Sequence, residues 1–225
     1  MKNTENIIKE KKEPWPTKDA MQQIYAMKLW GGNKFEFYSG NGSHDPEIVL
    51  PYIDILVSFL TSFENPLLVC DLGCGDFNVG KELVKYTEKY VGIDIVPELI
   101  EYNKENFTAD NLEFHCLDIA VDDLPHGDCA ILRQVLQHIS NTEIQSILPK
   151  LSEFRYVILT EHIPEGDFVP NKDIISGQGN RTKKLSGLNL LVPPFNFKIK
   201  EEKQLLSVIL SDGKGVIVTT LYKFF

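Results

Sequence analysis

Apolar residues follow two alternating patterns from residue 66 onward. Short, nearly continuous apolar runs predict buried strands, and longer segments with apolar residues three or four positions apart predict amphipathic helices. The predicted strands span residues 67–71, 90–95, 112–117, 128–132 and 155–160, and the predicted helices span 79–89, 97–107 and 141–151. Strands that alternate with helices in this order form a parallel sheet with helices on both faces. We therefore expect a doubly wound α/β fold.

The two ends of the chain follow different patterns. Before residue 65, apolar positions at helical spacing predict a helix over 19–30, and Asp45-Pro46 predicts the start of a second helix that runs to residue 60. At the other end, apolar runs over 198–210 and 216–225 flank Asp212-Gly213, which predicts an antiparallel hairpin. We expect a mostly parallel seven-stranded sheet that ends in this hairpin. An N-terminal helical cover, residues 1–64, should form one compact unit with residues 65–225.

Glycines and a carboxylate gather where the first predicted strand ends. This strand leads into Asp71, Gly73, Cys74 and Gly75, and glycines at such a bend let a ligand approach bare backbone. In a doubly wound sheet, ligands bind beyond the carboxyl ends of the strands. We therefore interpret Asp71 and this glycine loop as one wall of a ligand site.

Two further aspartates end the next two strands. Asp94, followed by Ile95, lies nineteen residues after Gly75, where an acidic side chain can accept hydrogen bonds from both hydroxyls of a ribose. Asp118 and Ile119 offer a carboxylate and an adjacent backbone N–H. Each feature also has an ordinary explanation as a turn, a helix cap or a loop start. Their coincidence at three successive strand ends favours a nucleoside site.

The glycine loop departs from the dinucleotide-binding pattern. Asn78 stands where the Gly-x-Gly-x-x-Gly pattern has its third glycine, and Asp71 and Asp76 would repel a pyrophosphate. Carboxylates instead favour a cofactor that carries a sulfonium and an ammonium group, through Coulomb attraction. We therefore expect a positively charged nucleoside cofactor.

With these residues, the chain resembles the class I S-adenosylmethionine-dependent methyltransferases. The resemblance covers roughly residue 67 to the C-terminus and rests on residues 69–75, 91–94, 115–119 and 133–134 and on the terminal hairpin. It implies S-adenosyl-L-methionine as the cofactor. It also implies that the glycine loop with Asp71 holds the methionine portion, Asp94 the ribose, and Asp118 with Ile119 the adenine.

One position departs from the pattern of this family. Phe77 stands where many members have a third glycine. Asn78 tolerates unusual backbone angles better than most residues, so we expect it to allow a slightly reshaped turn. The contact that Asp76 makes stays open.

Two histidines are candidates for proton transfer. The sulfonium already activates the methyl carbon, so the protein must mainly align the acceptor and exclude water, and a base is needed only if the acceptor loses its proton early. His138, after the fourth strand, and His162, after the fifth, carry imidazoles whose ordinary pKa of about 6.5 suits this role. Either can equally be a structural histidine. We expect Arg133 and Gln134 at the cofactor edge, although Arg133 can alternatively pair with an acidic substrate or a structural carboxylate.

Two segments are candidates for the acceptor side of the site. Residues 30–44 include Trp30, Phe35, Phe37 and Tyr38 and lead into glycines, a combination that suits a lid but also a plain connector. Residues 164–194 form a long loop, and loops of this length are usually functional or disordered.

Composition and charge narrow the range of partners. The chain of 225 residues carries a formal net charge of -9, so the phosphate backbone of a nucleic acid is repelled. No apolar run is long enough to cross a bilayer and no apolar signal-peptide core follows Met1, so we expect a cytoplasmic protein. The four cysteines form no Cys-x-x-Cys pair. We interpret them as reduced core residues and expect no metal site.

These observations together predict methyl transfer from S-adenosyl-L-methionine to an oxygen or nitrogen nucleophile of a small molecule. Two alternatives stay open: a nucleic-acid methyltransferase, which salt-sensitive RNA binding would favour, and an NAD-dependent oxidoreductase. A binding module that keeps the cofactor but has no acceptor pocket is a further possibility.

Overall fold

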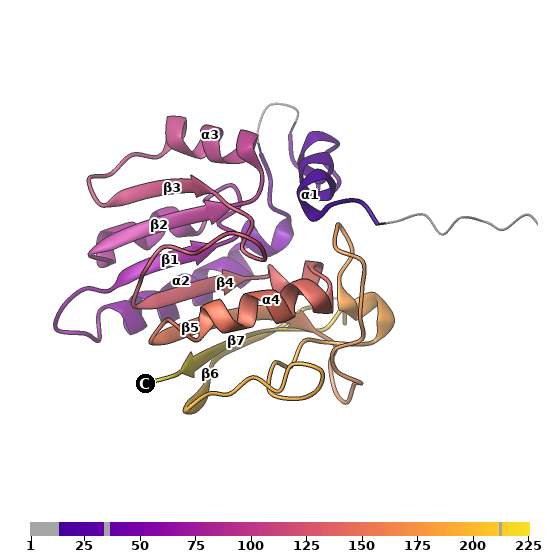
Figure 1. The fold of residues 1–225 in the computed structure, drawn as a ribbon. Coiled ribbons are helices and arrows are strands. Elements are labelled where there is room, and N and C mark those ends of the chain that lie inside the picture. The colour runs from indigo at the N-terminus through magenta and orange to yellow at the C-terminus, as the bar shows by residue number, and fades with distance from the viewer. Residues whose placement is uncertain (1–13, 34–36, 212) are drawn as a thin grey trace, which may run out of the picture.

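A seven-stranded sheet forms the centre of the molecule, with the strand order β3-β2-β1-β4-β5-β7-β6 (Figure 1). The computed structural model describes residues 14–33, 37–211 and 213–225. The strands are β1 (Leu68–Leu72), β2 (Lys89–Asp94), β3 (Leu112–Cys116), β4 (Cys129–Arg133), β5 (Tyr156–Ile163), β6 (Glu201–Ile209) and β7 (Val216–Lys223). Strands β1 to β5 are parallel, and β7 pairs antiparallel with both β5 and β6. The predicted doubly wound sheet with its antiparallel hairpin is confirmed.

Helices cover both faces of this sheet. The helix α2 (Pro46–Leu60) begins at the predicted cap, where the Asp45 side chain accepts a hydrogen bond from the Glu47 N–H, and it packs on the face that exposes Val69 and Ile131. The helix α4 (Asn141–Leu151) packs on the opposite face. The helix α3 (Pro97–Asn106) contacts β2 and β3, and α1 (Thr17–Ala26) lies beyond the carboxyl ends of the strands (Figure 1).

The helix predicted over 79–89 is wrong. Two short 3₁₀ turns, η2 (Gly80–Glu82) and η3 (Val84–Tyr86), connect β1 and β2 instead. Gly80 disfavours an α-helix, and the buried ring of Phe77 lies directly against it. The apolar side chains of this connection pack into the same core cluster as α2, so α2 supplies the helical layer on this face.

The cysteines only partly follow the prediction. All four carry free thiols, and Cys70 and Cys129 are buried. Cys116 is exposed because β3 is an edge strand of the sheet, and Cys74 is only partly buried at the glycine loop.

Three predicted features lie outside the described residues: the start of the chain, Phe35 of the possible lid, and Asp212 of the hairpin turn. Within the described ranges, no helix combines the length and the apolar character that a membrane span requires.

Candidate functional site

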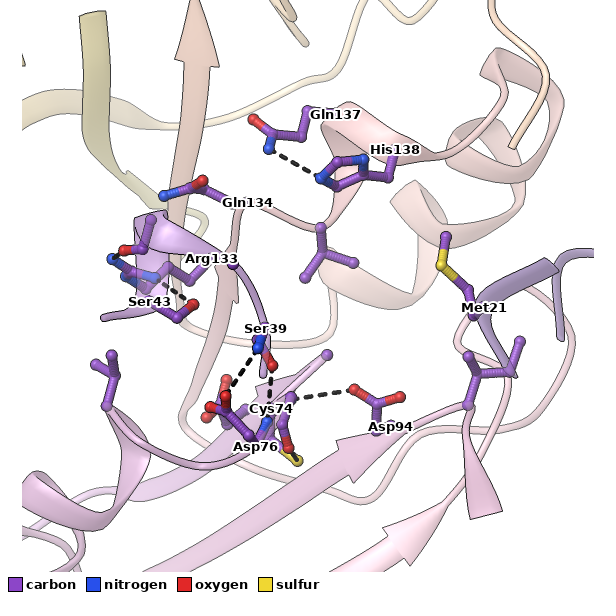
Figure 2. Close-up of a pocket in the computed structure, with 18 of the residues that line it drawn as sticks. Met21, Ser39, Ser43, Cys74, Asp76, Asp94, Arg133, Gln134, Gln137 and His138 are labelled. Atoms are coloured by element: carbon purple, nitrogen blue, oxygen red, sulfur yellow. Dashed lines mark hydrogen bonds between the residues drawn. The ribbon is translucent and has the colours of Figure 1, made fainter. Parts of the chain in front are cut away.

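A cavity of about 340 Å³ lies at the carboxyl ends of β1 to β4 (Figure 2). The residues predicted for the site all line it: Asp71, Gly73, Cys74, Gly75, Asp94, Ile95, Asp118, Ile119, Arg133, Gln134, His138 and His162. Their roles toward a ligand remain predictions, but the structure brings them to one cavity of the size typical of small-molecule sites.

The glycine loop is tied to neighbouring elements through its backbone. Gly73 and Gly75 have φ values of +89° and +57°, which favour glycine. The Gly73 N–H donates to the Ile93 carbonyl at 2.7 Å, and the Gly75 N–H donates to Asp94 Oδ2 at 3.1 Å. On the other side, Asn103 Nδ2 of α3 donates to the Gly75 carbonyl at 2.8 Å. The loop is therefore fixed in shape by β2 and α3.

Phe77, rather than Asn78, takes the unusual backbone conformation. Its φ is +61°, so the position where many family members have glycine does require the left-handed region here. The ring of Phe77 is fully buried and packs edge-on against Tyr90, Phe107 and Phe114. This burial offsets the strain that a non-glycine residue pays at positive φ.

Asp71 and Asp94 are buried carboxylates with few partners. Asp71 Oδ2 accepts a hydrogen bond from the Tyr90 hydroxyl at 2.8 Å. Asp94 accepts from the backbone N–H groups of Gly75 and Val96, both at 3.1 Å, so it also caps the start of α3. Burial raises the pKa of each carboxyl group to about 6. Each side chain keeps lone pairs that a ligand can use.

Asp118 stands at the third strand end, as expected. Its Oδ1 accepts a hydrogen bond from the Ala120 N–H at 2.9 Å, and its own N–H donates to Asp122 at 2.8 Å. The ordinary explanation, a loop start, therefore applies to Asp118 as well, while its side chain still lines the cavity.

Asp76 holds a segment of the N-terminal cover over the glycine loop. This segment, residues 37–44, is here named the strap. Asp76 accepts hydrogen bonds from the Ser39 N–H at 2.8 Å and from His44 Nε2 at 2.6 Å. Its own N–H donates to Ser39 Oγ at 2.9 Å, and Ser39 Oγ also bonds the Tyr25 hydroxyl of α1. The contact of Asp76 that the sequence left open is thus with the strap.

Arg133 and Gln134 also contact the strap. Arg133 donates to Ser43 Oγ at 3.1 Å and to the Gly42 carbonyl, and its guanidinium lies 4.9 Å from the centre of the Tyr52 ring. The side-chain amide of Gln134 packs against Gly42. Both residues line the cavity as predicted, but their protein partners belong to the cover rather than to an acidic side chain.

The two candidate histidines differ in what their ring nitrogens do. His138 Nδ1 donates to the Gly179 carbonyl at 3.1 Å, so its Nε2 must accept from Gln137 Nε2, which lies at 3.1 Å. Burial lowers the pKa of His138 to about 4, so this imidazole is neutral. His162 lies within β5 rather than after it, and its Nε2 donates to the Lys214 carbonyl at 2.8 Å. That bond leaves Nδ1 of His162 as the acceptor nitrogen.

Sequence analysis did not identify most of the side chains that line the cavity opposite the strand ends. Met21 and Tyr25 of α1, together with Trp30, Gln178 and Asn180, line it. Of these, the sequence singled out only Trp30. Met21 and Tyr25 belong to the helix predicted over 19–30, and Gln178 and Asn180 lie in the long loop 164–194, where no pattern marked single residues. The lid and long-loop segments thus both reach the cavity through their described residues.

Comparison with known proteins finds a family model that matches part of the chain. Residues 69–154 match a family model described as a methyltransferase domain. No curated protein sequence matches the chain at a significant level.

Solved structures with low sequence identity share the fold. Human N-acetylserotonin methyltransferase in complex with SAM has a TM-score of 0.60 and 16% identity over 93% of this chain, which spans 60% of that protein. Magnesium protoporphyrin IX methyltransferase from Synechocystis PCC 6803 with bound SAM has a TM-score of 0.57 and 16% identity, covering 95% of this chain and 100% of that one. The N-methyltransferase NodS from Bradyrhizobium japonicum WM9, with S-adenosyl-l-homocysteine, has a TM-score of 0.63 and 11% identity, covering 91% and 99%.

The fold is that of the class I methyltransferases. Its sheet order with the antiparallel β7 is shared with these structures, which contain SAM or S-adenosyl-l-homocysteine. The model of a methyltransferase domain matches residues 69–154, which is less than half of the chain.

Proposed function

We propose that the protein transfers a methyl group from S-adenosyl-L-methionine to an oxygen or nitrogen atom of a small molecule, and that it is not the NAD-dependent oxidoreductase that the sequence left open. The observation that carries this proposal is the cavity at the strand ends, which the strand-end aspartates share with α1, Trp30 and the strap. The strap is bonded to Asp76 and Arg133 across this edge of the sheet, so the acceptor must fit beneath a cover. Such a space suits a small molecule better than a polymer.

The residues at the strand ends fit the cofactor. The carboxylate of Asp71, whose pKa burial raises, gains from a cationic ammonium or sulfonium nearby, and the positive φ of Gly73 and Gly75 lets the loop turn tightly beside it. Asp94 has unused lone pairs for two ribose hydroxyls, and Asp118 with Ile119 borders the place for the adenine. When bound, the cofactor supplies the methyl group that the acceptor attacks.

Between the two histidines, the hydrogen bonds favour His162 as the general base. The lone pair of His138 already accepts from Gln137, and the low pKa of His138 makes it a weak base. At His162, Nδ1 faces no partner among the described residues. We propose that this nitrogen would accept the proton that an acceptor hydroxyl loses during the methyl transfer.

Two further parts of the proposal concern the cover and the compartment. Residues 1–64 would act as a cover over the site, as the described contacts of Ser39 and Tyr25 suggest. The cytoplasm is the compartment we propose, because free thiols on all four cysteines are typical of a reducing environment.

The test combines calorimetry with a turnover assay. We expect S-adenosylhomocysteine to bind the wild-type protein and the His162→Gln variant equally well. With an acceptor found by the release of S-adenosylhomocysteine from a metabolite mixture, His162→Gln should lower kcat about 10²-fold or more if the acceptor is a hydroxyl. The control is His115→Gln, which changes an exposed histidine on β3. Absence of S-adenosylhomocysteine binding would contradict the function, and unchanged turnover of a hydroxyl acceptor in His162→Gln would remove only the base.

A further inference from the structure

We propose that the methyl acceptor carries a flat aromatic ring and no anionic group. This inference rests on the proposed function, because it assigns the cavity next to Asp71, Asp94 and Asp118 to the cofactor. The acceptor then occupies the remaining part, which α1, Trp30 and the 3₁₀ turn η4 (Leu136–His138) border. Figure 2 shows Met21 and His138 on the side of the cavity away from Cys74 and Asp76.

Aromatic rings dominate this acceptor side. The ring centres of Tyr25 and Trp30 lie 5.4 Å apart with an interplanar angle of 84°, and those of Trp30 and His138 lie 5.2 Å apart at 48°. All three side chains line the cavity and are only partly buried, as is Met21 beside them. Aromatic rings and a thioether prefer to cover such surface with another ring, by edge-to-face or offset contacts.

Most polar side chains around these rings already have partners inside the protein. Gln137 bonds both the His162 N–H and His138, and both nitrogens of His138 are used. Glu143 accepts from the Ser140 hydroxyl at 2.6 Å and from the hydroxyls of Thr17 and Ser176. A ligand in this part of the cavity therefore gains its binding energy mainly from ring contacts.

The charge of the cavity excludes an anionic acceptor. The carboxylates that line it are Asp71, Asp76, Asp94, Asp118 and Glu143. Among the described residues that line it, Arg133 is the only lysine or arginine, and its guanidinium is engaged by the strap and by Tyr52. The cofactor has two cationic groups and one carboxylate, so it adds one positive charge and leaves the cavity acidic. A carboxylate or phosphate on the acceptor would be repelled.

The experiment uses matched acceptors with the full-length protein and S-adenosyl-L-methionine. Naphthol and naphthylamine are compared with hydroxynaphthoate and aminonaphthoate, which add a carboxylate, and with the saturated decahydronaphthol and decahydronaphthylamine. Release of S-adenosylhomocysteine measures turnover, and calorimetry on the protein loaded with S-adenosylhomocysteine measures acceptor binding. We expect the uncharged aromatic compounds to exceed both matched partners at least tenfold in kcat/KM or in affinity.

Variants of the two tryptophans test whether the preference for aromatic acceptors comes from the Trp30 side chain. Trp30→Ala should raise the KM or the Kd of naphthol about tenfold, and Trp30→Phe should restore most of the loss, while the Kd of S-adenosylhomocysteine stays unchanged. Trp15→Ala is the control, because Trp15 is 58% exposed and does not line the cavity. Three results would each overturn the inference. The first is equal or better use of the carboxylates or the saturated compounds, the second is no binding of naphthol or naphthylamine, and the third is no effect of Trp30→Ala. Loss of S-adenosylhomocysteine binding by the wild type would instead contradict the proposed function.

Discussion

The burial of Asp71 and Asp94 destabilises the folded protein but prepares the site for a cation. Both carboxyl groups are buried, and their pKa values rise from 3.8 to about 6 because burial disfavours the charged form. At neutral pH they are mostly ionised, and a cation bound between them regains part of this cost. The same groups that weaken the free protein therefore strengthen binding of a positively charged ligand.

The affinity for S-adenosyl-L-methionine should consequently depend on pH. We expect it to weaken as the pH falls from about 7.5 to about 5.5, because protonation of Asp71 and Asp94 removes the charges that attract the sulfonium and ammonium groups. S-adenosylhomocysteine lacks the sulfonium charge, so its affinity should fall less. Calorimetry of both ligands across this range measures the difference, and equal pH dependence of the two would contradict it.

Stability of the ligand-free protein should show the opposite pH dependence, mainly at lower pH. The folded-state pKa values lie above the unfolded value of 3.8, so the folded state binds more protons between about pH 4 and pH 6. The free energy of unfolding contributed by these two groups therefore falls as the pH rises through this window and is constant above it. Urea unfolding of the wild type and of Asp94→Asn at several pH values tests this, because the variant should show a shallower fall.

Asp94 should matter for cofactor affinity more than an exposed aspartate does. We expect Asp94→Ala to weaken cofactor binding by about 1–3 kcal/mol, because ribose hydroxyls and the Gly75 N–H lose a charged acceptor. Asp110→Ala, at an exposed position before β3, serves as the control and should leave the dissociation constant unchanged. If calorimetry finds the same constant for both variants, the proposed ribose role is wrong.

For single residues of the site, the position at a strand end was predictable from the sequence, but the hydrogen-bond partners were not. Each predicted residue lines the cavity because a strand end fixes where it stands, whatever the loops do. Tyr90 and Asn103 escaped notice because their hydrogen bonds, to Asp71 and Gly75, cross between elements. Only the folded sheet brings these atoms together.

Among the elements, the turn η4 is held by two buried ionisable residues, Glu161 and Arg181. Glu161 of β5 accepts a hydrogen bond from the Leu136 N–H at 3.2 Å, and burial raises the pKa of Glu161 to about 8. Arg181, which is 1% exposed, donates to the carbonyls of Leu136 and Ile139 at 2.8 and 2.7 Å. Part of the long loop is thus a structural clamp on the turn that carries Gln137 and His138.

Removing this clamp should destabilise the protein. We expect Arg181→Ala to lower the free energy of unfolding by about 3 kcal/mol, because buried carbonyl groups lose their donors and Glu161 loses a nearby positive charge. Arg155→Ala, at an exposed position before β5, should change it by less than about 1 kcal/mol. Urea unfolding compares the two, and equal effects would show that Arg181 does not hold the turn.

Long elements with clear apolar patterns were predictable, and short connections were not. The helices α2 and α4 begin where Asp45 and Ser140 cap them, and local sequence determines such starts. The connection after β1 has apolar positions compatible with a helix, yet the burial of Phe77 and the packing of α2 give it 3₁₀ turns. Tertiary packing therefore determined the secondary structure where the local helix propensity was weak.

For the whole molecule, the net charge of -9 opposes binding to nucleic acids. We expect no salt-sensitive binding of single-stranded RNA in fluorescence anisotropy at about 0.15 M salt, because affinity for the phosphate backbone comes from clustered lysine and arginine. A protein with a steep salt dependence of RNA affinity would need a nucleic acid as its acceptor, contrary to the proposal. The same titration on the protein loaded with S-adenosylhomocysteine controls for a cofactor-dependent surface.

The position of α2 links the two ends of the polypeptide. This helix, formed by residues 46–60, packs against β1, β4 and β5 and contacts β6, formed by residues 201–209. During synthesis on the ribosome, its apolar face is therefore made early but completely covered only after nearly the entire chain has emerged. Contacts between such distant residues slow folding, so a nascent chain arrested before β6 would leave this face open to chaperones.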